Sequence, residues 1–128
     1  MRIKLATIWV DDQDAAREFY GEKLGFKIHT DLAYGPEGRW LTVVSPEDPT
    51  VELLLALPDG PAKALQDHLR NQGTPAQSFV SDDIQAEYDA LVARGVDFKM
   101  PPTRMDYGGT DAVFEDGCGN LLNLHQDE

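Results

Sequence analysis

The stretch IWVDDQDAAREFYGEKLGF, residues 8–26, decides the fold. Residues 8–10 are the last of a run of β-branched and aromatic side chains, which predicts a strand over 3–10. The carboxylates that follow are candidate helix N-caps, and apolar residues then recur at helical spacing. Gly25 stands where a helix C-terminus favours a left-handed residue. The stretch therefore predicts a strand followed by a helix over about 12–24.

Three more strands are expected after this helix, since β-prone runs alternate with turns rich in Gly and Pro. They cover residues 26–33, 39–45 and 51–57. The segment 58–73 then predicts a short connecting helix that closes at Gly73.

The second half repeats this order of elements. A strand over 75–80 precedes a helix that should begin at Asp82 and end at Gly95. The remaining pattern predicts a loop over 101–109 and strands over 96–100, 110–116 and 120–126.

An offset of 70 positions relates the two halves: it aligns Val10 with Val80, Asp12 with Asp82, Ala16 with Ala86, and Gly25 with Gly95. We therefore predict a single α+β domain of two tandem βαβββ modules. Module one covers 1–57, the connector 58–73 and module two 74–128. Their sheets should form a curved mixed sheet around a cavity, with the helices on the outer face.

Charge and cysteine content limit the possible partners. The formal net charge of −12 disfavours binding to nucleic acid and to anionic membranes, and mildly favours a cationic ligand. Cys118 is the single cysteine, so no intramolecular disulfide can form. With no secretory signal and no apolar stretch of spanning length, the sequence predicts a soluble cytoplasmic protein.

Two motifs resemble those of the glyoxalase/bleomycin-resistance/extradiol-dioxygenase (vicinal oxygen chelate) superfamily. The first comprises Phe19-Tyr20 and Leu24-Gly25-Phe26 at the end of the first predicted helix. The second lies in the last hairpin, where Gly117 and Cys118 replace the usual Pro-Asp and the matching residues are Phe114, Asp116, Gly119 and Asn120. The resemblance implies this fold and a homodimer. It does not choose between enzymes and drug-sequestering proteins, because the superfamily contains both.

The same resemblance implies four metal-ligand positions, two from each half. In this sequence they are occupied by Leu5, Glu52, Pro75 and Asn123. Leucine and proline side chains carry no donor atom, and a neutral amide is a weak ligand for a catalytic divalent ion. We therefore expect no metal and no other cofactor, with a divalent metal as the alternative.

Glu52 is the most informative residue, because it interrupts the apolar strand VELLLAL. A carboxylate in such a strand either pairs with a cation, faces a polar cavity, or has a raised pKa. Arg39 on the neighbouring strand is a candidate partner. One interpretation is a structural ion pair; the other is a cavity carboxylate that binds ligand or acts as a general base.

Aromatic and polar residues on the predicted strands are candidates for lining the cavity. Alternation sets Thr7 and Trp9 opposite the apolar face formed by Ala6, Ile8 and Val10. Further candidates for ligand binding are Trp40, Phe79, Tyr107, Asn123 and His125. For each aromatic residue, ordinary core packing is the alternative interpretation, and for His125 it is a strand end near solvent.

The other histidines and the cysteine are weaker candidates. His29 and His68 are expected at the surface, and no histidine spacing indicates zinc or iron. Cys118 is expected in a nearly exposed turn, where a catalytic thiol would need a base beside it.

Three functions therefore remain open. The leading hypothesis is a metal-free protein that binds a small aromatic or cationic molecule. The second is an enzyme, either a metal-dependent lyase or dioxygenase or a metal-free isomerase with Glu52 as its base. The third is a regulatory module that binds a partner protein.

Overall fold

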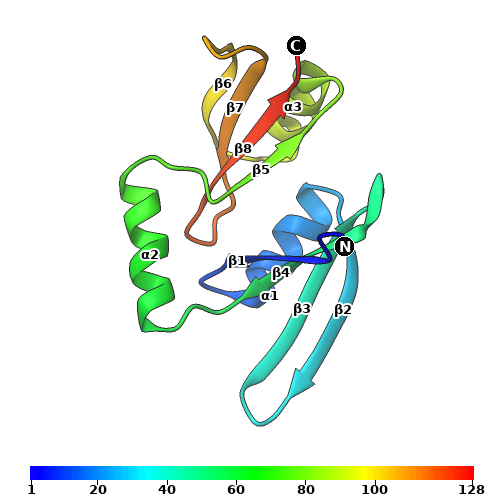
Figure 1. Ribbon diagram of the computed structural model, residues 1–128, viewed down its shortest axis with the longest axis vertical. Coiled ribbons are helices and arrows are strands. Elements are labelled where there is room, and N and C mark those ends of the chain that lie inside the picture. The colour runs from blue at the N-terminus through cyan, green and yellow to red at the C-terminus, as the bar shows by residue number, and fades with distance from the viewer. The chain divides into compact units, whose positions relative to one another are not determined.

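A computed structural model describes all residues from 1 to 128 and divides the chain into two compact units, Met1–Ala64 and Leu65–Glu128 (Figure 1). The division falls inside α2 (Gly60–Asn71), in the segment predicted to be the connector. Each unit contains its own four-stranded mixed sheet. None of the helices combines the length and the apolar character needed to span a membrane.

Unit 1 contains β1 (Leu5–Trp9), α1 (Gln13–Glu18), a π-helical turn η1 (Phe19–Lys23), β2 (Lys27–Tyr34), β3 (Gly38–Ser45) and β4 (Asp48–Ala56). The strand order is β1-β4-β3-β2, with β1 and β4 parallel and the other pairs antiparallel. β4 begins before the predicted residue 51, because pairing with β3 continues into the expected turn.

Unit 2 contains β5 (Gln77–Val80), α3 (Ile84–Ala93), β6 (Phe98–Arg104), β7 (Thr110–Glu115) and β8 (Leu121–Gln126). The strand order is β5-β8-β7-β6, again with one parallel pair, β5 and β8. These arrangements confirm the α+β class and the tandem βαβββ modules. The first part of the predicted loop 101–109 is instead strand, since β6 lies at the sheet edge, where proline is tolerated.

In unit 1 one face of the sheet lies under α1, and its side chains alternate with those of the other face. Ile8 and Val10 are buried with Leu41, Val43 and Leu55 on the α1 side. Thr7 and Trp9 lie on the opposite face, which we call the open face. The predicted facing of the first strand is therefore confirmed.

Unit 2 has the same division. Ala112, Phe114, Leu122 and Leu124 are buried on the α3 side. The rings of Tyr88 and Phe98 extend this packing, with centroids 4.6 Å apart. The alternate residues of β7 and β8 lie on the open face of this sheet, among them Asp111, Asn123 and His125.

The helical segment made of α1 and η1 is one residue longer than α3. Asp12 caps α1 by accepting from the Ala15 N–H at 3.0 Å, and Asp83 caps α3 by accepting from the Ala86 N–H at 3.1 Å. The predicted cap at Asp82 is therefore wrong by one position. The first helix reaches its closing glycine one residue later than the second, and the π-helical turn η1 absorbs this residue.

The cap assignment can be tested by a matched pair of substitutions. Asp83→Ala should lower the free energy of unfolding by about 1 kcal/mol, because it removes an N-cap acceptor. Asp82→Ala, one residue earlier and exposed, should change it by less than about 0.5 kcal/mol. Urea denaturation followed by circular dichroism measures both. An equal loss in the two variants would contradict the assignment.

Candidate functional site

Glu52 is buried on the open face of unit 1, with 7% of the residue exposed. Its carboxylate accepts from the Lys4 ammonium at 2.9 Å and from the Thr42 hydroxyl at 2.9 Å, and His29 Nδ1 lies 3.0 Å away. The hydrogen bonds from Lys4 and then Thr42 outweigh the effect of burial and lower the pKa of Glu52. Glu52 is therefore an ionised carboxylate with fixed partners.

Arg39 lies on the other face of the same sheet. Its guanidinium donates to Asp31 at 2.8 Å and to Asp14 of α1 at 2.6 Å. The predicted pairing of Arg39 with Glu52 is wrong, because side chains alternate along β3 and Thr42, which contacts Glu52, has the opposite facing. Arg39 instead ties α1 to the sheet. Trp40, its neighbour, is partly exposed on the open face.

A pocket of about 580 Å³ lies within unit 2, on the open face of its sheet. Five apolar residues line it: Pro75, Ala76, Met100, Met105 and Val113. Its polar lining comes from Gln77, Ser78, Tyr107, Asp111 and Asn123. A mostly apolar concavity with a few convergent polar groups is typical of a small-molecule site. We call it the unit 2 pocket.

Asp111 is at the centre of the polar lining. The Tyr107 hydroxyl donates to its Oδ2, and its Oδ1 lies at hydrogen-bond distance from His125 Nδ1. Burial alone would raise the pKa of Asp111, but the bonds from Tyr107 and His125 lower it overall. The same contacts raise the pKa of Tyr107 and of His125. The far nitrogen of His125, Nε2, lies 3.1 Å from Asp127.

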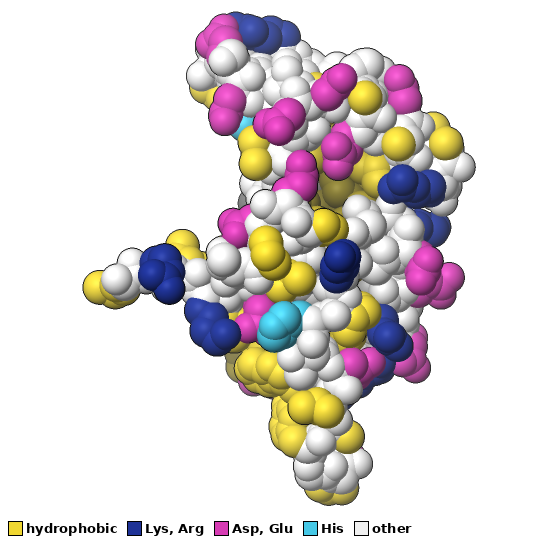
Figure 2. Space-filling view, turned by 90° about the vertical axis from the view of Figure 1, so that its right-hand side faces the viewer, with side chains coloured by type: hydrophobic (Ala, Val, Ile, Leu, Met, Phe, Trp, Pro, Cys, Tyr) yellow, Lys and Arg dark blue, Asp and Glu magenta, His cyan; other side chains and the backbone are white.

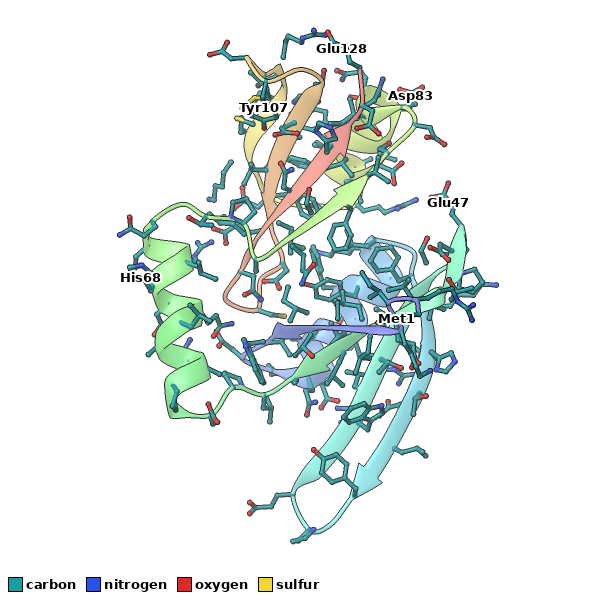
Figure 3. All side chains as sticks on the ribbon, in the orientation of Figure 1. Met1, Glu47, His68, Asp83, Tyr107 and Glu128 are labelled. Atoms are coloured by element: carbon teal, nitrogen blue, oxygen red, sulfur yellow. The ribbon has the colours of Figure 1, made fainter.

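The loop between β6 and β7 brings Tyr107 to this cluster, at the end of the sheet where the two strands are joined (Figure 3). Tyr107 is 70% exposed, so its ring presents a face to solvent while its hydroxyl stays tethered. Gly109 has a φ of +78°, and a Cβ there would lie 2.7 Å from His125 Cε1. It would also lie 2.6 Å from the backbone oxygen of Gln126, so a side chain at 109 would collide with both the β8 backbone and the His125 ring.

Asn123 and Ser78 complete the polar lining. The Asn123 amide nitrogen donates to Ser78 Oγ at 2.9 Å, and the Asn123 side chain is the last of the groups that lower the pKa of Asp111. Phe79, the next residue of β5, pairs with Leu124 and faces α3 instead. The structure thus brings Tyr107, Asn123 and His125 together in unit 2, whereas Thr7, Trp9, Trp40 and Glu52 lie in unit 1.

Sequence reasoning missed Asp111, although a signal for it exists. Asp111 and His125 are cross-strand partners in the β7–β8 hairpin. The hairpin turn at Asp116–Asn120 fixes that pairing, because each step away from the turn pairs one residue from each strand. Counting outward from the turn would have placed this carboxylate opposite the predicted histidine.

The turn also corrects the expectation for Cys118. The buried Asp116 side chain accepts from the backbone N–H groups of Cys118 and Asn120 at 2.7 and 3.0 Å. These bonds turn the Cys118 side chain inward, so it is 2% exposed rather than nearly exposed. A buried thiol of this kind is poorly placed to act as a nucleophile.

The residues at the four implied metal positions do not fit a metal ion. Leu5 and Pro75 have no donor atom, Glu52 is paired with Lys4, and the Asn123 amide is bonded to Ser78. No cluster of three or more His, Cys, Asp or Glu side chains in the structure is arranged to hold a metal.

Comparisons with known proteins agree in family. A sequence profile of the Glyoxalase/Bleomycin resistance protein/Dioxygenase superfamily matches residues 2–124. The uncharacterized protein YurT of Bacillus subtilis is 46% identical, over 98% of this chain and 99% of its own length.

Two solved structures are similar along the whole chain. UcmS2 has a TM-score of 0.83 and 34% identity, covering 98% of this chain and 97% of its own. TnmS3, described as an antibiotic binding protein from Streptomyces sp. CB03234, has a TM-score of 0.80 and 27% identity, covering 100% of this chain and 97% of its own.

The role of Glu52 can be tested by stability. Glu52→Gln removes the charge that Lys4 and Thr42 stabilise, and should lower the free energy of unfolding by about 1–3 kcal/mol. Glu47→Gln, in an exposed turn, is the matched control and should have little effect. Equal urea midpoints for Glu52→Gln and the wild type would contradict the assigned ion pair.

His125 should make stability depend on pH. Because its pKa is raised in the folded state, its contribution is complete below pH 6.5 and is lost as pH rises through the folded pKa. The drop in melting temperature from pH 6 to pH 9 should therefore be smaller in His125→Gln than in the wild type. His68→Gln, at an exposed position on α2, should keep the wild-type drop. NMR titration of the His125 ring measures the pKa directly.

Proposed function

Because this chain belongs to the Glyoxalase/Bleomycin resistance protein/Dioxygenase superfamily, we propose that it binds a small aromatic or cationic molecule without a metal. The observation that carries the proposal is the unit 2 pocket, whose apolar walls and few polar groups suit a flat compound. TnmS3, similar in fold, is described as binding an antibiotic. Sequestration of such a compound is the activity that we propose for this chain.

The composition of the pocket supports an adaptable site. Met100 and Met105 supply unbranched, polarisable thioethers that adjust to ligands of different shape and contact aromatic rings favourably. Tyr107 adds an aromatic face at the rim. Acidic side chains are spread over the surface seen in Figure 2, in line with the net charge of −12, which attracts cations at a distance.

No observation favours the enzyme alternative. A lyase or dioxygenase of this superfamily would need metal ligands that positions 5 and 75 do not provide. An isomerase with Glu52 as base would need a pKa raised toward neutrality, whereas the contacts of Glu52 lower it. A location in the cytoplasm and assembly into a homodimer remain predictions from the sequence.

Ligand binding is tested with two flat compounds, neutral naphthalene-2-carboxamide and cationic proflavine, in thermal-shift and calorimetric titrations. At least one should raise the melting temperature and bind. Tyr107→Ala should weaken that binding about five- to tenfold, because it removes the aromatic wall. Tyr34→Ala, at a similarly exposed tyrosine of unit 1, is the control and should leave it unchanged.

The absence of both binding events up to millimolar concentration would end the proposal. The metal-free part is tested separately, by elemental analysis of protein purified without an affinity tag. Stoichiometric nickel, zinc, manganese or iron would overturn it.

A further inference from the structure

Asp111 is the one ionised side chain that lines the unit 2 pocket, and it is already fully engaged. Its side chain is 8% exposed, with Tyr107 bonded to its Oδ2 and His125 to its Oδ1. Each carboxylate oxygen thus already has one internal partner, and burial restricts access to the remaining acceptor sites. A ligand cation could therefore reach Asp111 only by displacing one of these partners.

His125, the cross-strand partner of Asp111, compensates the charge of the Asp111 carboxylate. Both ring nitrogens face carboxylates, Nδ1 toward Asp111 and Nε2 toward Asp127. Carboxylates only accept, so this geometry favours a proton on each nitrogen and raises the pKa of His125. The titratable groups around Asp111 are therefore Tyr107 and His125, with Asp127 beyond them. The pocket offers a ligand no unpaired charge of either sign.

The polar group that is left for a ligand is neutral. The Asn123 amide nitrogen donates to Ser78, and the nearby Asp111 carboxylate, which cannot donate, favours the same orientation of the amide. The Asn123 carbonyl oxygen, Oδ1, accepts no hydrogen bond. Ser78 and Asp111 hold this acceptor in one orientation beside the apolar walls.

We infer that the unit 2 pocket selects an uncharged flat ligand that donates an N–H or O–H to Asn123 Oδ1, in preference to cations and carboxylates of the same ring. This inference rests on the proposed function and narrows it. Burying an ion without a partner costs more than burying a neutral amide that keeps one hydrogen bond. The attraction of the net charge for cations does not reverse the order, since charges are screened beyond about 8 Å at physiological salt.

A series of four naphthalene probes tests the charge and the donor separately. The carboxamide, the N,N-dimethylcarboxamide, the carboxylate and the methylammonium share one ring and substituent position. Binding is measured by calorimetry at neutral pH and about 0.15 M salt, where the screening length is about 8 Å. The carboxamide should bind about tenfold tighter than either ion. It should also bind about fivefold tighter than the dimethyl amide, which has no donor.

Variants locate the acceptor. Asn123→Leu keeps the approximate shape but removes Oδ1, so the carboxamide and the dimethyl amide should bind equally. Asn71→Leu, the same substitution at an exposed position of α2 outside the pocket, is the control and should keep the difference. If Asn123→Leu does not fold, the binding of the four probes by the wild type still tests the inference.

The outcomes separate this inference from the function on which it rests. Binding of the methylammonium or the carboxylate as tightly as the carboxamide would overturn the inference and leave the proposed function in place. Equal binding of the two amides by the wild type would also overturn it. If no naphthalene probe binds, the inference fails, and the proposed function fails with it only if proflavine does not bind either.

Discussion

Each four-stranded sheet packs one of its faces, the buried face, against its single covering helix, and this constraint organises both units. The buried face takes the aliphatic and aromatic residues of alternate positions, such as Val10 and Leu55 in unit 1 and Phe114 and Leu122 in unit 2. Polar residues that interrupt the strands must then lie on the open face. Glu52 and Asp111 do so in their respective sheets, and each is nevertheless almost fully buried.

A buried carboxylate is tolerated only when its charge is compensated, and the two units achieve this differently. Glu52 takes its compensation from Lys4 at the chain terminus and from Thr42. Asp111 takes it from His125 on the adjacent strand and from Tyr107 in a loop. Removing either set of partners would leave an unpaired ion in a site of low polarity. The polar residues of the open face therefore stabilise the fold through their internal partners. Only the hydrogen-bonding groups that these partners leave unused are available to a ligand.

The sequence was most informative where one local rule dominates. Alternation along β1 correctly separated Thr7 and Trp9 from the core, and Gly25 correctly marked the end of the first helix. Prediction failed where the outcome depends on a partner that lies outside the residue's own strand. Arg39 is drawn to Asp31 and Asp14, and Glu52 to a lysine 48 positions away, which no periodicity indicates. Asp111 was missed for the same reason, although the hairpin turn would have identified its partner.

The one-residue excess in the first helix has a consequence for any comparison of the two halves. Counted back from the helix caps Asp12 and Asp83, the position equivalent to Leu5 in the second half is Ala76 rather than Pro75. An alignment of the two halves without a gap, anchored on Gly25 and Gly95, therefore matches each residue of β1 with a residue that has the opposite facing in β5. The π-helical turn η1 acts as a one-residue insertion. An alignment of the two modules needs a gap at η1 before the role of a residue in one module is assigned to its equivalent in the other.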